Sequence, residues 1–169
     1  MGIYSHPSGQ QANRFNVTVN TMDIASILSP ECVLFKSQCN SKKRMLETIA
    51  SHLCDVNPVL DPSHVFSALI ARERLGSTGI GHGIAIPHCR IKGCANIIGV
   101  LVTLDNGIDF DAIDNEPVDI IFVLVVPEDE DQDHLQTLAA LAERFSGKER
   151  LNKIRQASSS QELYQTITE

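Results

Sequence analysis

The chain has 169 residues, 43% of them hydrophobic, which is the size at which one domain can bury a substantial core. Its formal net charge is −7 and its largest basic cluster is the run Lys42-Lys43-Arg44, so it lacks the basic face that nucleic acid requires. We therefore expect a single acidic domain that does not bind DNA or RNA.

The first half of the chain predicts alternating strands and helices after a polar start. Residues 1–20 lack apolar periodicity, which predicts a flexible N-terminal tail ahead of a domain that spans residues 21–169. Residues 32–35 predict a strand, and Ser41 can then cap a helix whose apolar side chains recur at helical spacing. Asp61-Pro62 is a cap followed by a proline in the first helical position, so a second helix is expected to begin there.

A glycine-rich segment follows the second helix: residues 76–88 read Gly-Ser-Thr-Gly-Ile-Gly-His-Gly-Ile-Ala-Ile-Pro-His. Its glycines permit positive φ and close backbone approach, so amide N–H groups such as those of Gly79 and Gly81 can converge on an anion beside the hydroxyls of Ser77 and Thr78. The spacing matches neither the dinucleotide-binding fingerprint nor a phosphate-binding P-loop. A tight turn without a ligand is therefore the alternative interpretation.

The segment ends at His88, directly after an apolar run and Pro87. Proline fixes φ, lacks a backbone donor and tends to end strand pairing, so we expect His88 at a strand end on the edge of the fold. An imidazole is neutral near physiological pH and offers a nitrogen that can carry a phosphoryl group. The alternative is a structural histidine bonded to the backbone.

The second half of the chain completes the predicted architecture. Residues 97–104 and 118–126 are β-rich, and the nearly continuous apolarity of the second run predicts a central strand covered on both faces. An acidic turn leads to a helix expected over residues 135–145, and Ser159 with Glu162 forms a capping-box pattern before a last helix. The order of elements predicts an α/β fold, a three-layer α/β/α sandwich with a small mixed β-sheet.

Five cysteines at irregular spacings fit neither a disulfide framework nor a zinc site of Cys-x-x-Cys pairs, and they favour a reducing compartment. No apolar run approaches the roughly 18 residues of a membrane span, and the N-terminus lacks a basic-then-apolar signal. We expect a cytoplasmic protein without membrane insertion. Cys89 beside His88 suggests a thiol nucleophile or a metal site, but further ligands are missing at the usual spacings, so neither a metal nor a cofactor is expected.

Three segments carry a family resemblance: residues 76–88, residues 110–119 (Phe-Asp-Ala-Ile-Asp-Asn-Glu-Pro-Val-Asp) and residues 133–138 (Asp-His-Leu-Gln-Thr-Leu). In this order they resemble the phosphotransferase-system enzyme IIA proteins of the mannitol/fructose class, most closely the nitrogen-regulatory branch. The resemblance runs from about Met22 to the C-terminus. Two positions depart from it, since members often carry asparagine in place of His82 and glycine in place of Cys89.

The resemblance implies that His88 is the phosphoacceptor, through a tele-phosphohistidine intermediate, with Arg72 and His134 as its catalytic partners. Arg72 would neutralise the phosphoryl oxygens, and the alternative is a solvated pair with Arg74 that flanks Glu73, itself interpreted as a helix-end charge. His134 would hydrogen-bond the phosphoryl group or the acceptor ring, and the alternative is an exposed histidine at a helix start. The predicted phosphate-binding residues are Ser77, Thr78, Gly79 and Gly81.

The resemblance also implies a function, that of a phosphotransferase component acting as phosphoryl carrier and regulator in a nitrogen-related system. The donor would be a small histidine-phosphorylated carrier protein. The output would be regulation of partner proteins by phosphorylation state, with potassium-transport and sensor-kinase components as candidates. One alternative is a sugar-specific (fructose- or mannitol-type) enzyme IIA that passes phosphate to a IIB component. Another is a binding module that has lost the chemistry.

Overall fold

The computed structural model describes residues 23–129 and 133–169, with Asp133 and His134 described by their backbone alone. The tail predicted for residues 1–20 lies outside the described residues. Within the described ranges, no helix is both long enough and apolar enough to cross a membrane.

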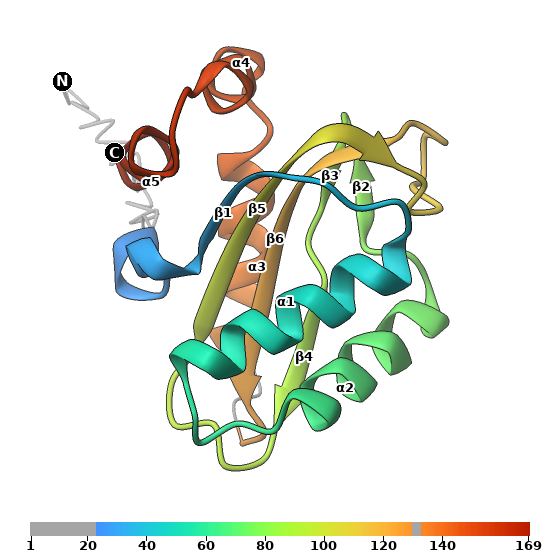
Figure 1. Ribbon diagram of the computed structural model, residues 1–169, viewed down its shortest axis with the longest axis vertical. Coiled ribbons are helices and arrows are strands. Elements are labelled where there is room, and N and C mark those ends of the chain that lie inside the picture. The colour runs from blue at the N-terminus through green and yellow to red at the C-terminus, as the bar shows by residue number, and fades with distance from the viewer. Residues whose placement is uncertain (1–22, 130–132) are drawn as a thin grey trace, which may run out of the picture.

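A six-stranded mixed sheet lies at the centre of the described chain (Figure 1). Its strands are β1 (Val33–Ser37), β2 (Gly79–Gly81), β3 (Ile84–Ala85), β4 (His88–Ile91), β5 (Ile98–Ile108) and β6 (Val118–Pro127). β6 is central, because β5 pairs with it antiparallel on one side while β3 and β4 pair with it parallel on the other. β1 lies parallel to β5, and β2 lies antiparallel to β3.

Helices cover both faces of this sheet. They are α1 (Lys42–Val56), α2 (Pro62–Leu75), α3 (Asp133–Arg144), α4 (Lys148–Gln156) and α5 (Ser160–Thr168), with short 3-10 helices η1 (Ile24–Ser26) and η2 (Pro30–Cys32) before β1. α1 and α2 lie on the near face in Figure 1, α3 lies behind the sheet, and α5 packs against β1. The predicted three-layer α/β/α sandwich with a small mixed sheet is confirmed.

Local sequence signals set the helix starts as expected. Ser41, Asp61 and Ser159 each accept a hydrogen bond from a backbone N–H in the first turn of α1, α2 and α5. These bonds satisfy donors that have no partner within the helix. The predicted capping box is only half formed, because the Glu162 carboxylate accepts from the N–H and hydroxyl of Ser158 rather than from Ser159.

β3 and β4 form one interrupted strand beside β6. Ile84 pairs with Ile120 before the interruption, and His88 pairs with Leu124 after it. Between them, the carbonyl of Pro87 accepts a hydrogen bond from the Leu124 N–H at 2.9 Å. Proline lacks the donor but keeps the acceptor, so one side of the ladder survives. Pro87 therefore interrupts the strand without ending the pairing with β6, and His88, which was expected at a strand end, is the first residue of β4.

β6 carries the core of the molecule. Val118 and all seven residues at 120–126 are fully buried, which confirms the burial on both faces predicted from their apolarity. Phe122 packs against Phe145, which directly follows α3, with the ring centroids 6.1 Å apart. The strand that borders His88 is thus held rigidly between the two helical layers.

A glycine on β5 gives a test of this packing. A Cβ at Gly99 would lie 2.7 Å from two ring carbons of Phe122 and 3.3 Å from the Ile27 carbonyl oxygen. We expect Gly99→Ala to lower the free energy of unfolding by about 1–3 kcal/mol, because the ring must move within a close-packed core. Urea denaturation checks this. Gly147→Ala is the control, since its Cβ meets no atom closer than 4.0 Å, and equal midpoints for the two variants would contradict the packing argument.

Candidate active site

The ring of His88 is half-buried and has a defined tautomer. Nδ1 lies 2.9 Å from the carbonyl oxygen of Ile86, and Nε2 lies 3.2 Å from Nε of Arg72. A carbonyl only accepts, so Nδ1 carries the hydrogen; the Arg72 N–H only donates, so Nε2 presents its lone pair. These contacts of Nδ1 and Nε2 fit a neutral imidazole whose Nε2 lone pair faces a guanidinium.

Arg72 reaches His88 from the last turn of α2. Its Nη1 donates to the Gly76 carbonyl at 2.8 Å, and its Nε donates to His88 across 16 residues of sequence. Two directed hydrogen bonds hold the planar guanidinium in place, whereas Arg74 is exposed. Of the two arginines, the structure brings Arg72 to the histidine.

The hydroxyls of the glycine-rich loop have partners inside the protein. The Ser77 hydroxyl donates to the Phe110 carbonyl at 2.7 Å and accepts from the Gly79 N–H at 3.1 Å, while the Thr78 hydroxyl donates to Glu73. These bonds hold the loop against the segment that follows β5. Phosphate binding by Ser77, Thr78, Gly79 and Gly81 stays a prediction.

Gly79, the first residue of β2, lies against the loop that follows β5 and has no room for a side chain. An added Cβ would lie 2.7 Å from the Cβ and 2.9 Å from the Cα of Ala112. The Ile113 N–H also donates to the Gly79 carbonyl at 3.3 Å. The first two segments of the predicted three-segment pattern, residues 76–88 and 110–119, are therefore in contact through their backbones.

A buried ion pair lies behind this loop, and sequence reasoning missed it. The Glu73 side chain is 2% exposed, and its Oε2 lies 3.0 Å from Nζ of Lys42, which is 21% exposed. Lys42 also donates to the Phe110 carbonyl at 3.2 Å. Glu73 lies in the last turn of α2, as expected of a helix-end charge, but its side chain is buried and not solvated. A signal was present, because Glu73 follows Val65 and Leu69 at four-residue spacing and so falls on the buried face of α2.

Two departures from the family pattern have clear structural consequences. Burial raises the pKa of the Cys89 thiol to about 12, with Cys94 as a smaller cause, so Cys89 stays protonated at neutral pH. A buried thiol with a raised pKa is a poor nucleophile at neutral pH. His82 lies in the β2–β3 turn with φ of 57°, and its N–H donates to the Asp114 carboxylate at 2.9 Å. This confirms the turn placement expected for His82.

The remaining predicted site residue is His134, the second residue of α3. The helix start expected beside it is confirmed, but its side chain lies outside the described residues. Within the part of the chain that the structure describes, no three His, Cys, Asp or Glu side chains are grouped closely enough to hold a metal ion.

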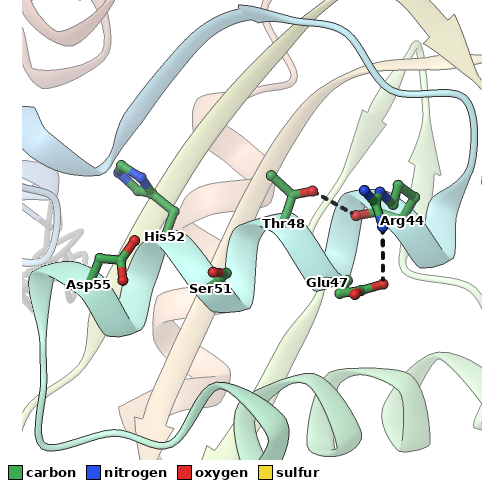
Figure 2. A pocket seen from close by; sticks show the side chains of 6 residues that line it. All are labelled: Arg44, Glu47, Thr48, Ser51, His52 and Asp55. Carbon is green, nitrogen blue, oxygen red and sulfur yellow. Dashed lines mark hydrogen bonds and ion pairs between the residues drawn. The ribbon is translucent and has the colours of Figure 1, made fainter.

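A polar hollow lies on the outward face of α1, away from the sheet (Figure 2). It is lined by Arg44, Glu47, Thr48, Ser51, His52 and Asp55. Arg44 and Glu47 form an ion pair there at 3.9 Å, with side chains 72% and 54% exposed. This exposed pair serves as a control for the buried pair of Lys42 and Glu73, which lies on the same side of the molecule.

The chain and its fold match a known family. Residues 26–169 match the family described as "Phosphoenolpyruvate-dependent sugar phosphotransferase system, EIIA 2". The chain belongs to this family and is therefore a phosphotransferase component. The resemblance seen in its motifs is confirmed.

Within the family, the chain is similar to nitrogen regulatory proteins. It is 46% identical to that of Escherichia coli strain K12 over 150 residues, covering 88% of this chain and 91% of that protein. It is 42% identical to that of Pseudomonas aeruginosa over 146 residues, covering 86% and 95%. The crystal structure of IIA-Ntr from Neisseria meningitidis superimposes with a TM-score of 0.80 at 37% identity, over 86% of this chain and 99% of that one. These relatives support a IIA protein of the nitrogen phosphotransferase branch.

The buried ion pair gives a prediction about stability. Lys42→Met leaves the Glu73 carboxylate buried without its cation, so the free energy of unfolding should fall by about 2–4 kcal/mol. Arg44→Met on the same helix should change it by about 0.5 kcal/mol or less, because exposed pairs contribute little. Chemical denaturation of both variants measures the difference. Equal stability of the two variants would contradict the assignment of Lys42 as the partner of a buried charge.

Proposed function

We propose that the protein accepts a phosphoryl group on Nε2 of His88 from a small histidine-phosphorylated carrier protein. It then regulates partner proteins according to its phosphorylation state. The observation that carries the proposal is the neutral imidazole with its Nε2 lone pair 3.2 Å from Nε of Arg72. The similarity to nitrogen regulatory proteins supports the regulatory role over sugar transport. The five cysteines, none of which forms a disulfide, support a cytoplasmic location.

The transfer forms one bond and breaks one. The Nε2 lone pair of His88 attacks phosphorus, and the P–N bond of the donor phosphohistidine breaks with its electron pair returning to the donor ring. Each ring keeps the hydrogen on its other nitrogen, so no proton passes between the proteins. His88 becomes a cationic phosphoimidazolium whose Nδ1–H still donates to the Ile86 carbonyl, now as a charge-assisted bond.

Arg72 supplies the positive charge that this step needs. A loose phosphoryl-transfer transition state spreads negative charge over three equatorial oxygens, so the protein contributes mainly position and electrostatic stabilisation. The Arg72 guanidinium can move its hydrogen bond from Nε2 to these oxygens without leaving the site. In the proposal, His134 adds a hydrogen bond from the start of α3.

Exposed apolar side chains around the loop support a protein as the donor. Leu75 ends α2 directly before the loop and is 85% exposed, Ile80 in β2 is 43% exposed, and Ile113 is 83% exposed beside Gly79. Large apolar side chains that are exposed around a site are typical of protein docking surfaces. We therefore propose that the carrier protein docks over the rim formed by Leu75, Ile80 and Ile113.

Mass spectrometry after incubation with phosphoenolpyruvate, enzyme I and the small carrier protein tests the proposed function. We expect one acid-labile phosphoryl group on the wild type and none on His88→Ala, because the nucleophile is gone. His82→Ala is the control and should remain labelled, since its backbone groups rather than its ring make the turn contacts. Labelling of His88→Ala would exclude His88 as acceptor. Transfer onward to an added sugar-specific IIB would favour the sugar-specific alternative.

The proposed role of Arg72 predicts a graded loss of rate. Arg72→Ala should slow phosphorylation by about 100-fold or more, as loss of one transition-state donor does elsewhere. Arg72→Lys should recover part of this, because lysine keeps the charge and loses the planar fork. Single-turnover kinetics with the phosphorylated carrier measure these rates. If Arg72→Ala reacted as fast as the wild type, the guanidinium would have no role in the transfer.

A further inference from the structure

An unbroken series of polar contacts joins the buried ion pair to the acceptor ring. Nζ of Lys42 lies 3.0 Å from Oε2 of Glu73, and the Glu73 carboxylate accepts from the Thr78 N–H, with Oε1 at 3.2 Å, and from the Thr78 hydroxyl. The Thr78 carbonyl accepts from the Ile86 N–H at 3.0 Å. The Ile86 carbonyl in turn accepts from Nδ1 of His88 at 2.9 Å.

Two adjacent residues of α2 thus act on opposite sides of one imidazole. Arg72 contacts Nε2 directly, whereas Glu73 is connected to Nδ1 through the backbones of Thr78 and Ile86. The Ile86 carbonyl assigns the hydrogen to Nδ1, so the tautomer depends on where that carbonyl points. Ile86 lies in the interruption between β3 and β4, where its N–H bonds to Thr78 rather than to β6.

We propose that Glu73, neutralised by Lys42, is a positioning residue for phosphoryl transfer that holds His88 in its Nδ1–H tautomer. The proposal rests on the proposed role of His88 as phosphoacceptor. Glu73 fixes Thr78, Thr78 fixes Ile86, and the Ile86 carbonyl keeps the hydrogen on Nδ1 so that the Nε2 lone pair faces the incoming phosphorus. Displacement of a reacting group by 1 Å can cost about 100-fold in rate, so the precision of this connection matters for transfer.

The pairing with Lys42 explains how a buried carboxylate can serve beside a site for an anion. An unpaired carboxylate there would repel a phosphoryl group that carries nearly two negative charges. Lys42 offsets that charge, and its further bonds to Phe110 hold the adjacent loop in place. Lys42 and Glu73 therefore order the loop without adding net charge. The positive charge beside the His88 ring then comes from Arg72.

The test compares two charge-neutral double variants. Lys42→Met with Glu73→Gln removes the buried pair while keeping side-chain size, and Arg44→Met with Glu47→Gln makes the same changes in the exposed pair of Figure 2. Nitrogen-15 NMR of the unphosphorylated proteins reports the His88 tautomer. Single-turnover phosphorylation at varied donor concentration separates the maximal rate constant from the half-saturating concentration.

We expect the buried-pair variant to populate both His88 tautomers and to lose about tenfold or more in the maximal rate constant. Its half-saturating donor concentration should stay within about twofold, because the substitutions replace none of the exposed side chains Leu75, Ile80 and Ile113 that are proposed for docking. The exposed-pair variant should match the wild type in both measurements. A buried-pair variant with wild-type tautomer and rate would overturn the proposal, as would a loss confined to donor binding.

A milder variant keeps the test decisive if the buried-pair variant does not fold. Thr78→Val removes the hydroxyl donor to Glu73 and preserves the shape of the side chain. It should shift the tautomer in the same direction by a smaller amount, and an unchanged tautomer would overturn the proposal. The NMR measurement needs no phosphoryl donor, so its outcome is independent of the proposed function. Failure to label the wild type would contradict the function instead.

Discussion

Parallel pairing to β6 is the constraint on which the site depends. β6 is buried along almost its whole length and is held by β5 on one side, so its other side is a fixed template. β3 and β4 pair with this template before and after Pro87; between them, the Pro87 carbonyl still accepts from Leu124, whereas the Ile86 N–H bonds to Thr78 and not to β6. The interruption frees the Ile86 carbonyl to bind the ring of His88 while both flanking segments stay anchored. The side chain proposed to react is thus held on a strand that pairs with the buried centre of the sheet.

The last turn of α2 supplies the charges that act on that side chain. Arg72 and Glu73 are adjacent in sequence, yet one faces the half-buried ring and the other enters the interior to meet Lys42. Because neighbouring helical residues point about 100° apart, a single turn can serve two different environments. Opposite charges placed so close together would largely cancel, but the pairing of Glu73 with Lys42 leaves the charge of Arg72 available at the ring.

The surroundings of the His88 ring fit the proposal that partner proteins distinguish its phosphorylated state from its unphosphorylated state. A phosphoryl group adds about two negative charges to a rim that carries the exposed side chains of Leu75 and Ile113. A partner that buries these side chains would have to bury that charge as well. The same surface can therefore accept a donor that brings the phosphoryl group and discriminate between the two states afterwards.

The sequence by itself determined the elements that depend on residues close to one another along the chain. Ser41 and Asp61 start helices because their side chains bond to amides two or three residues away, and the strand over residues 118–126 is central because it is apolar throughout. His88 was singled out by the residues adjacent to it. The site, by contrast, depends on contacts between distant segments. Local patterns could not place Lys42 against Glu73, the hydroxyl of Ser77 on Phe110, or Arg72 on the ring, because these positions follow from how α1, α2 and the loops pack around β6.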